Sequence, residues 1–223
     1  MDSANLNAII SAVSGLTGVG IGALLTHLRE LRAENIKDKR DTSYLAILVV
    51  THLDRFANGC MSVAFDDGTS EGRPAGEDGV YHRTTVRPPE FAPLDINVEW
   101  RVLPRELMYD ILEIPAKQEH LENQLSGVME FDDPPEYAEF FMHRRRNYAD
   151  LGLKVSGVAK RLREFAQMRI EESIPGDWNR DAAMQEVIDK LDAERSAHDK
   201  RQAESWAKIE TPPVPTVPTA IDG

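Results

Sequence analysis

Apolar and polar residues alternate at helical spacing along most of the chain, and one stretch is apolar almost throughout. Residues 6–28 contain no Asp, Glu, Lys or Arg. As a helix that rises about 1.5 Å per residue, this stretch would reach about 34 Å, slightly more than the hydrocarbon core of a bilayer at about 30 Å. The pattern predicts a single N-terminal transmembrane helix, a membrane anchor within residues 1–28.

Small residues recur every four positions within this stretch. The set consists of Ser11, Ser14, Gly15, Gly18 and Gly22. A helix side without large side chains lets a second membrane helix approach closely. In a solitary helix in water, each glycine would instead cost about 1 kcal/mol relative to alanine. We expect these five residues to form a helix-packing face through which the chain self-associates as a homo-oligomer.

Residues 6–28 have three other interpretations. A cleavable secretory signal begins with basic residues, whereas Asp2 is the only early charge here. The glycines from Gly18 to Gly22 lack the Lys-Ser/Thr pair of a phosphate-binding loop. A buried core helix of a soluble bundle remains as an alternative to the anchor.

The charges that follow the apolar run predict an orientation. Residues 29–41 form a charged stalk whose basic members are Arg29, Arg32, Lys37, Lys39 and Arg40. Basic residues stay on the cytoplasmic side of a membrane helix. We therefore expect a single-pass protein whose C-terminal domain faces the cytoplasm.

Residues 42–208 predict a small helical-bundle domain, so the fold class is all-α. Apolar residues keep helical spacing from Leu45 onward, in a helix whose apolar face includes His52. Prolines at 104, 115 and 134–135 mark the starts of three more helices, and Gly152 separates the third from a fourth. A last helix runs from about residue 180 to 208, packed by its first half and solvated by its second.

Two segments have no helical pattern. Residues 66–99 read as a long irregular loop, in which 62–65 and 80–82 could pair as a short hairpin. Its acidic residues and His82 lack the ligand spacing of a calcium loop, so we expect a solvated loop and no metal site. Residues 209–223 form a Pro-rich tail that we expect to be disordered, with Pro212 and Pro215 at the spacing of polyproline ligands.

Composition limits the partners and the compartment. A net charge of −12 disfavours a nucleic-acid partner, because a protein that neutralises phosphates needs a basic surface. Cys60 is the only cysteine, which excludes an intramolecular disulfide and a cysteine-only metal cluster. We expect no metal and no cofactor.

One basic cluster stands inside the acidic domain. Arg144, Arg145 and Arg146 are consecutive, and consecutive residues point around a helix rather than along one face. We interpret them as a solvated face with local carboxylate partners such as Glu139. The alternative is a docking patch for an acidic partner or a lipid headgroup.

Candidates for acid/base catalysis are limited to histidines. They are His52, His82, His120 and His143. None lies in a motif that also supplies a nucleophile and an orienting carboxylate, so no catalytic residue is assigned and the chain is not expected to be an enzyme.

Several short motifs in the second half resemble a family of uncharacterised bacterial and prophage-borne proteins with a hydrophobic N-terminus. The motifs are Glu106-Leu107-Met108-Tyr109, Asp132-Asp133-Pro134-Pro135-Glu136-Tyr137, Tyr148-Ala149-Asp150-Leu151-Gly152-Leu153 and Gly176-Asp177-Trp178-Asn179. A weaker similarity covers residues 53–68. The resemblance implies no activity, only a bacterial or prophage origin, and hence the bacterial inner membrane as the location of the anchor.

The sequence thus favours a membrane-anchored, cytoplasm-facing helical protein with a binding or self-association role. A soluble or phage-structural oligomer could instead bundle through the glycine-rich N-terminal helices. An enzyme acting at the membrane surface is the third hypothesis. Detergent dependence separates the first two, and a pocket with convergent polar groups would favour the third.

Overall fold

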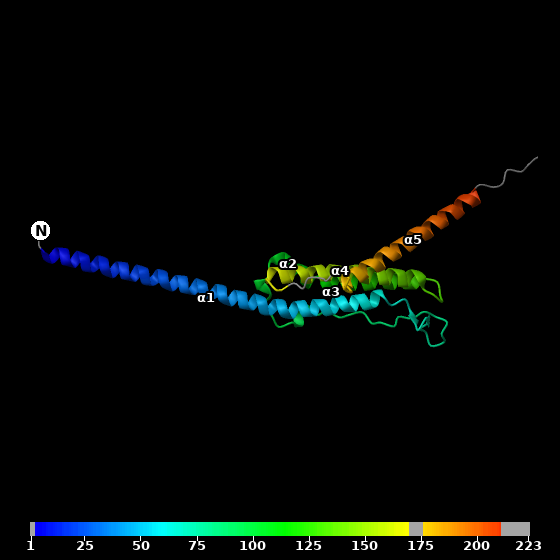
Figure 1. Ribbon diagram of the computed structural model, residues 1–223, viewed down its shortest axis with the longest axis horizontal. Helices are drawn as coiled ribbons and strands as arrows, with labels where there is room; N and C mark the ends of the chain where they lie inside the picture. Colours follow the sequence, from blue (N-terminus) through cyan, green and yellow to red (C-terminus); the bar gives the residue numbers. More distant parts are fainter. Residues whose placement is uncertain (1–2, 170–175, 211–223) are drawn as a thin grey trace, which may run out of the picture. The chain divides into compact units, whose positions relative to one another are not determined.

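The computed structural model of the protein describes residues 3–169 and 176–210 (Figure 1). Within its first helix, side chains are described at residues 26, 27, 29, 32, 37 and from 39 onward, and at the C-terminal end they are described up to residue 206. The elements are α1 (Ser3–Ala64), β1 (Thr69–Ser70), β2 (Arg73–Pro74), η1 (Pro93–Asp95), η2 (Trp100–Val102), α2 (Arg105–Leu112), α3 (Ile114–Phe131), α4 (Ala138–Phe165) and α5 (Arg180–Glu210). The expected all-α fold is confirmed.

Helix α1 is a single unbroken helix of 62 residues. Its backbone joins the three segments that the sequence separated, namely the apolar run, the charged stalk and the first helix of the domain. No proline precedes Pro74, so no residue of α1 lacks the backbone N–H that an internal helical turn needs. The helix ends where the sequence predicted, before Asp66-Asp67-Gly68, and Gly68 adopts a φ of 80°.

Among the residues that the structure describes, no helix has the length and apolar content needed to cross a membrane. The side chains of residues 6–25 lie outside the described residues. The predicted anchor and its packing face at Ser11, Ser14, Gly15, Gly18 and Gly22 therefore stay predictions.

The chain divides into two compact units. The first comprises Met1–Leu53, Phe91–Ile114 and Val158–Glu171. Within it α2 packs against η1 and η2. Its buried apolar residues are Leu45, Ala46, Val49, Val50, Leu53, Phe91, Ile96, Leu103, Leu107, Ile111, Ile114, Val158, Ala159 and Leu162.

The second unit comprises Asp54–Glu90, Pro115–Gly157 and Glu172–Gly223. Its core gathers the last turns of α1, the first part of α4 and the first half of α5. One cluster of this core consists of Ala64, Ala149, Met184, Val187, Ile188 and Leu191, against which Met61, Met142 and Leu153 pack.

Gly152 does not separate two helices, and the predicted break at this position is wrong. Helix α4 continues through it from Ala138 to Phe165. A Cβ on Gly152 would lie 2.6 Å from Met184 Sδ and 3.0 Å from Cys60 Cβ. The glycine therefore allows α1 and α5 to pack closely against α4, and this tertiary packing offsets its low helix propensity.

Residues 66–99, predicted to be a long irregular loop, contain β1, β2 and η1, and the predicted hairpin is wrong. Residues 62–64 belong to α1, and the short antiparallel pair instead joins Thr69 to Pro74 and Ser70 to Arg73. The helix reaches Ala64 because Val63 and Ala64 are fully buried as part of its apolar face.

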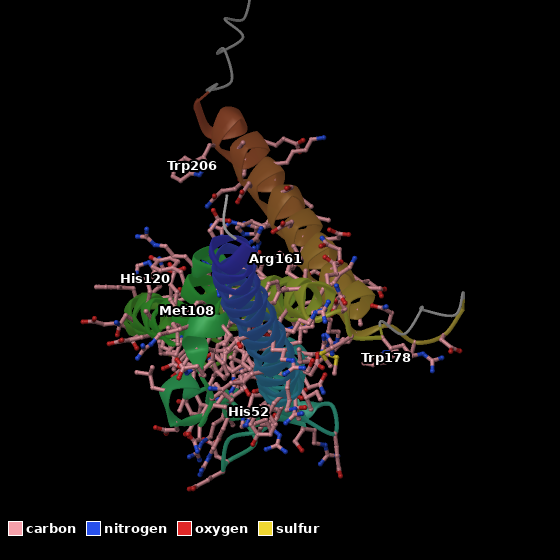
Figure 2. The ribbon with its side chains drawn as sticks, turned by 90° about the vertical axis from the view of Figure 1, so that its left-hand side faces the viewer. His52, Met108, His120, Arg161, Trp178 and Trp206 are labelled. Carbon is pink, nitrogen blue, oxygen red and sulfur yellow. The ribbon has the colours of Figure 1, made fainter. Side chains whose placement is uncertain are left out.

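Helix α5 packs as predicted. Its first half buries Met184, Val187, Ile188 and Leu191, whereas every residue from 193 to 206 is exposed. Trp206 extends from the exposed half with 61% of its surface accessible (Figure 2). The Pro-rich tail from residue 211 onward, including Pro212 and Pro215, lies outside the described residues.

Candidate functional site

A buried ion pair joins the end of α1 to α4 in the second unit. Arg144 Nη1 donates a hydrogen bond of 2.8 Å to Asp66 Oδ2, and the two side chains are only 3% and 0% exposed. Charged groups with so little water around them need full hydrogen bonding, because each alone would carry a large desolvation penalty.

The Asp66 carboxylate is surrounded by donors from its own loop. It accepts hydrogen bonds from Gly68 N, from Thr85 N and Oγ1, and from Val86 N, at 2.8 to 3.2 Å. Arg144 Nη2 donates to Val86 O at 2.6 Å. One carboxylate and one guanidinium thus hold both ends of the loop between residues 66 and 86.

The hydrogen bonds decide the ionisation of Asp66. Burial works to raise the pKa of its carboxyl group. The Val86 N–H, the Thr85 hydroxyl, Arg144 and the Gly68 N–H outweigh burial and hold the pKa below its ordinary value. Asp66 is therefore charged at neutral pH, as the ion pair with Arg144 requires.

The three arginines have no partner in common. Arg145 Nε donates to Ala64 O at 3.1 Å, and Arg146 Nη2 donates to Asp192 Oδ2 at 2.9 Å. The interpretation as a solvated face is wrong for Arg144, which is buried because α4 turns it toward the loop. The sequence contains one indication that Arg144 is buried, because it lies at helical spacing from Phe141 and Tyr148.

A groove lies beside this ion pair, and we call it the α3–α4 groove. It is open to solvent and has a volume of about 430 Å³. Its lining residues are Thr84, Pro88, Glu122, Leu125, Ser126, Met129, Phe140, Arg144 and Tyr148. Amphipathic helices supply the apolar floor, and the loop held by Asp66 supplies one wall.

Two hydrogen bonds orient the carboxylate of Glu122 in this groove. Tyr148 Oη donates to Glu122 Oε1 at 3.0 Å, and Gln118 Nε2 donates to the same oxygen at 3.0 Å. Gln118 Nε2 also donates to Pro89 O at 2.8 Å. Tyr148 is fully buried, and burial raises the pKa of its hydroxyl group. Tyr148 therefore acts here as a protonated donor.

A second groove of about 420 Å³ lies between α4, α5 and the loop. Its lining residues are Asp67, His82, Glu136, Ala138, Glu139, Phe141, Met142, Arg145, Leu191, Glu194, Arg195, His198 and Asp199. One pair of opposite charges lies within it, since Arg195 Nη1 is 3.4 Å from Glu139 Oε2. Its charges are thus partly compensated inside the molecule.

The histidines proposed for acid/base work do not form a catalytic group. His52 is exposed on α1 rather than buried in the apolar face, and His120 hydrogen-bonds to Gln124 on α3 (Figure 2). His82 Nδ1 lies 3.1 Å from Asp67 O. Within the described residues, none of the four hydrogen-bonds to a Ser, Thr or Cys side chain, and no group of three His, Cys, Asp or Glu could hold a metal ion.

Cys60 is fully buried in α1. Burial raises the pKa of its thiol to about 12, with Arg180 opposing this shift. Thiolate is the reactive form of cysteine, so Cys60 is a packing residue of the core.

The sequence indicates only some of the residues that line the α3–α4 groove. Tyr148 lies at helical spacing from Phe141 and Arg144 in the sequence, whereas Glu122 is one of several charged residues on α3. No family model matches the chain, and searches of curated proteins and of solved structures return no significant match. The resemblance to the bacterial and prophage proteins therefore stays an expectation.

Proposed function

We propose that the protein is a non-enzymatic scaffold with a single-pass anchor in the bacterial inner membrane. Its helical domain faces the cytoplasm. Residues 6–28 are the anchor, and their small-residue face holds copies of the chain together. The domain beyond residue 41 provides the binding surface.

The observation that supports this proposal most is the continuity of α1. One helix runs from Ser3 to Ala64, without a hinge between the uncharged run and the buried residues of the domain. The stalk of residues 29–41 would separate membrane and domain by about 20 Å. A continuous helix couples an anchor to its domain mechanically, which suits a scaffold.

The exposed basic residues of the stalk support the orientation. Arg29, Arg32, Lys37, Lys39 and Arg40 are all exposed on α1. At this position they would lie next to anionic headgroups of the cytoplasmic leaflet, which attract each such charge by about 1 kcal/mol. The acidic remainder of the chain would be repelled by the same surface.

Fractionation tests the proposal directly. The full chain and a chain lacking residues 1–28 are expressed in bacteria, and membranes are washed with alkaline carbonate. We expect the full chain to stay with the membranes and the truncated chain to be soluble. A chain lacking residues 211–223 is the control and should fractionate like the full chain. Release of the full chain as a defined oligomer without detergent would contradict the anchor and favour the soluble bundle.

A further inference from the structure

The α3–α4 groove has the composition of a small-ligand site. Leu125 is buried at its floor, Phe140 is half-buried, and Met129 stands at its rim with 40% of its surface exposed. A volume of about 430 Å³ lies within the range of small-molecule sites, which join an apolar lining to a few oriented polar groups.

Glu122, an exposed residue of α3 at the edge of the groove, is the oriented polar group. Its Oε1 atom accepts hydrogen bonds from Tyr148 and Gln118, so the carboxylate is fixed from two sides. Tyr148 is fully buried and cannot turn away to water. Neither of these hydrogen bonds uses Oε2, and among the described residues no Lys, Arg or His forms an ion pair with Glu122.

The other charge of the groove is already neutralised. Arg144 uses Nη1 for Asp66 and Nη2 for Val86 O. A ligand that entered the groove would therefore meet one uncompensated negative charge above an apolar floor. This arrangement favours a positively charged ligand and disfavours an anionic one.

We propose that the α3–α4 groove binds a small organic cation, a protonated amine attached to an apolar body. The ammonium group donates to Glu122 Oε2, and the apolar body covers Leu125, Met129 and Phe140. This site is independent of the membrane anchor proposed above.

The test uses the full chain with ¹³C-methyl methionine, dispersed in detergent where needed, because the Met129 methyl group reports on the groove. Its resonance is assigned with Met129→Leu. Phenethylammonium is the probe, and 2-phenylethanol and 3-phenylpropionate are its neutral and anionic counterparts. We expect the Met129 signal to shift saturably with a dissociation constant of about 1 mM for the cation. The Met108 signal, from the first unit, should not move.

Two matched variants separate the carboxylate from the apolar floor. Glu122→Gln keeps an oxygen for Tyr148 but removes the charge, and it should weaken cation binding about tenfold. Glu119→Gln removes an exposed charge of the same helix and should leave affinity unchanged. An unmoved Met129 signal, equal affinity for the three probes, or unaltered binding by the Glu122 variant would overturn the proposal. Thermal unfolding of each variant verifies that it folds.

Discussion

Gly152 of α4 lies directly against Met184 of α5, so closely that an added Cβ would stand 2.6 Å from the methionine sulfur. Cys60 of α1 approaches the same point at 3.0 Å. Three helices of the second unit therefore meet at a position where only glycine fits. We expect the stability of the unit to depend on this contact.

Gly152→Ala should lower the free energy of unfolding by about 1–3 kcal/mol, because the methyl group forces the buried Met184 side chain out of its position and crowds Cys60 Cβ. Urea unfolding measures the change. Gly157→Ala is the matched control in the same helix, since a Cβ there meets nothing within 4 Å. It should leave stability unchanged or raise it by about 0.5–1 kcal/mol. Equal effects of the two substitutions would show that helix propensity, not packing, determines the outcome.

Arg144→Met should release the loop between residues 66 and 86. The substitution leaves the buried Asp66 carboxylate without its cation, a change that costs about 3–5 kcal/mol in buried ion pairs. Limited proteolysis should cut the loop of the variant faster than that of the wild type. Arg101→Met removes an arginine whose side chain is 92% exposed. It should change neither the free energy of unfolding nor the rate at which the loop is cut. An uncut loop in the Arg144 variant would mean that the Asp66 backbone contacts suffice.

Stability should fall in acid partly through Asp66. Its pKa in the folded protein is lowered from the ordinary value of 3.8, so its contribution is complete above that value and is lost as pH falls through the folded pKa. We expect the stability difference between the wild type and Asp66→Asn to shrink below about pH 4. Asp67 and Asp192, whose pKa values are also lowered, are present in both proteins and cancel. A difference that stays constant down to pH 2 would contradict the assignment.

Cys60 should resist thiol reagents while the protein is folded. It is fully buried, so a reagent cannot reach its sulfur atom. Burial also raises the pKa of its thiol to about 12, so little of the reactive thiolate is present at neutral pH. Labelling with a chromogenic disulfide should be slow in buffer and rapid in denaturant. Ser62→Cys, at an exposed position of the same helix, provides a second thiol that should react at once.

The small-residue face of residues 11–22 can be tested by filling it. Replacing Gly18 and Gly22 with Leu raises hydrophobicity and blocks close helix approach. We expect the variant to remain in membranes but to lose self-association, as measured by cross-linking in membranes. Leu24→Ile changes a large apolar residue outside the face and is the control. Association that survives in the glycine variant would place the oligomer contact elsewhere.

Local signals predicted most element boundaries. Pro104 precedes α2, Pro115 is the second residue of α3, and the apolar spacing of Met184, Ile188 and Leu191 located the packed half of α5. The continuity of α4 could not be predicted, because Gly152 is explained only by helices that approach it from elsewhere in the chain.

The same limit applies to the site. Asp66 and Arg144 lie 78 residues apart, and each looks like an ordinary surface charge in its own segment. Pairing over such a distance is a tertiary property that periodicity does not encode. Glu122 is likewise ordinary until the fold brings Tyr148 to its carboxylate. The apolar floor of the groove, by contrast, follows from the helical spacing of Leu125 and Met129.

The unbroken helix α1 has a consequence for geometry. Each residue of an α-helix advances the chain by about 1.5 Å and turns it by about 100°. The number of residues between 28 and 42 therefore determines two quantities. One is the distance along the helix axis from residue 28 to Leu45, and the other is the direction about that axis in which the Leu45 side chain points. One inserted residue would rotate the following residues of α1 about the helix axis by about 100°. Seven inserted residues would return their side chains to within about 20° of the original direction. The length of the charged stalk thus determines the direction of the Leu45 side chain about the helix axis as well as its distance from residue 28.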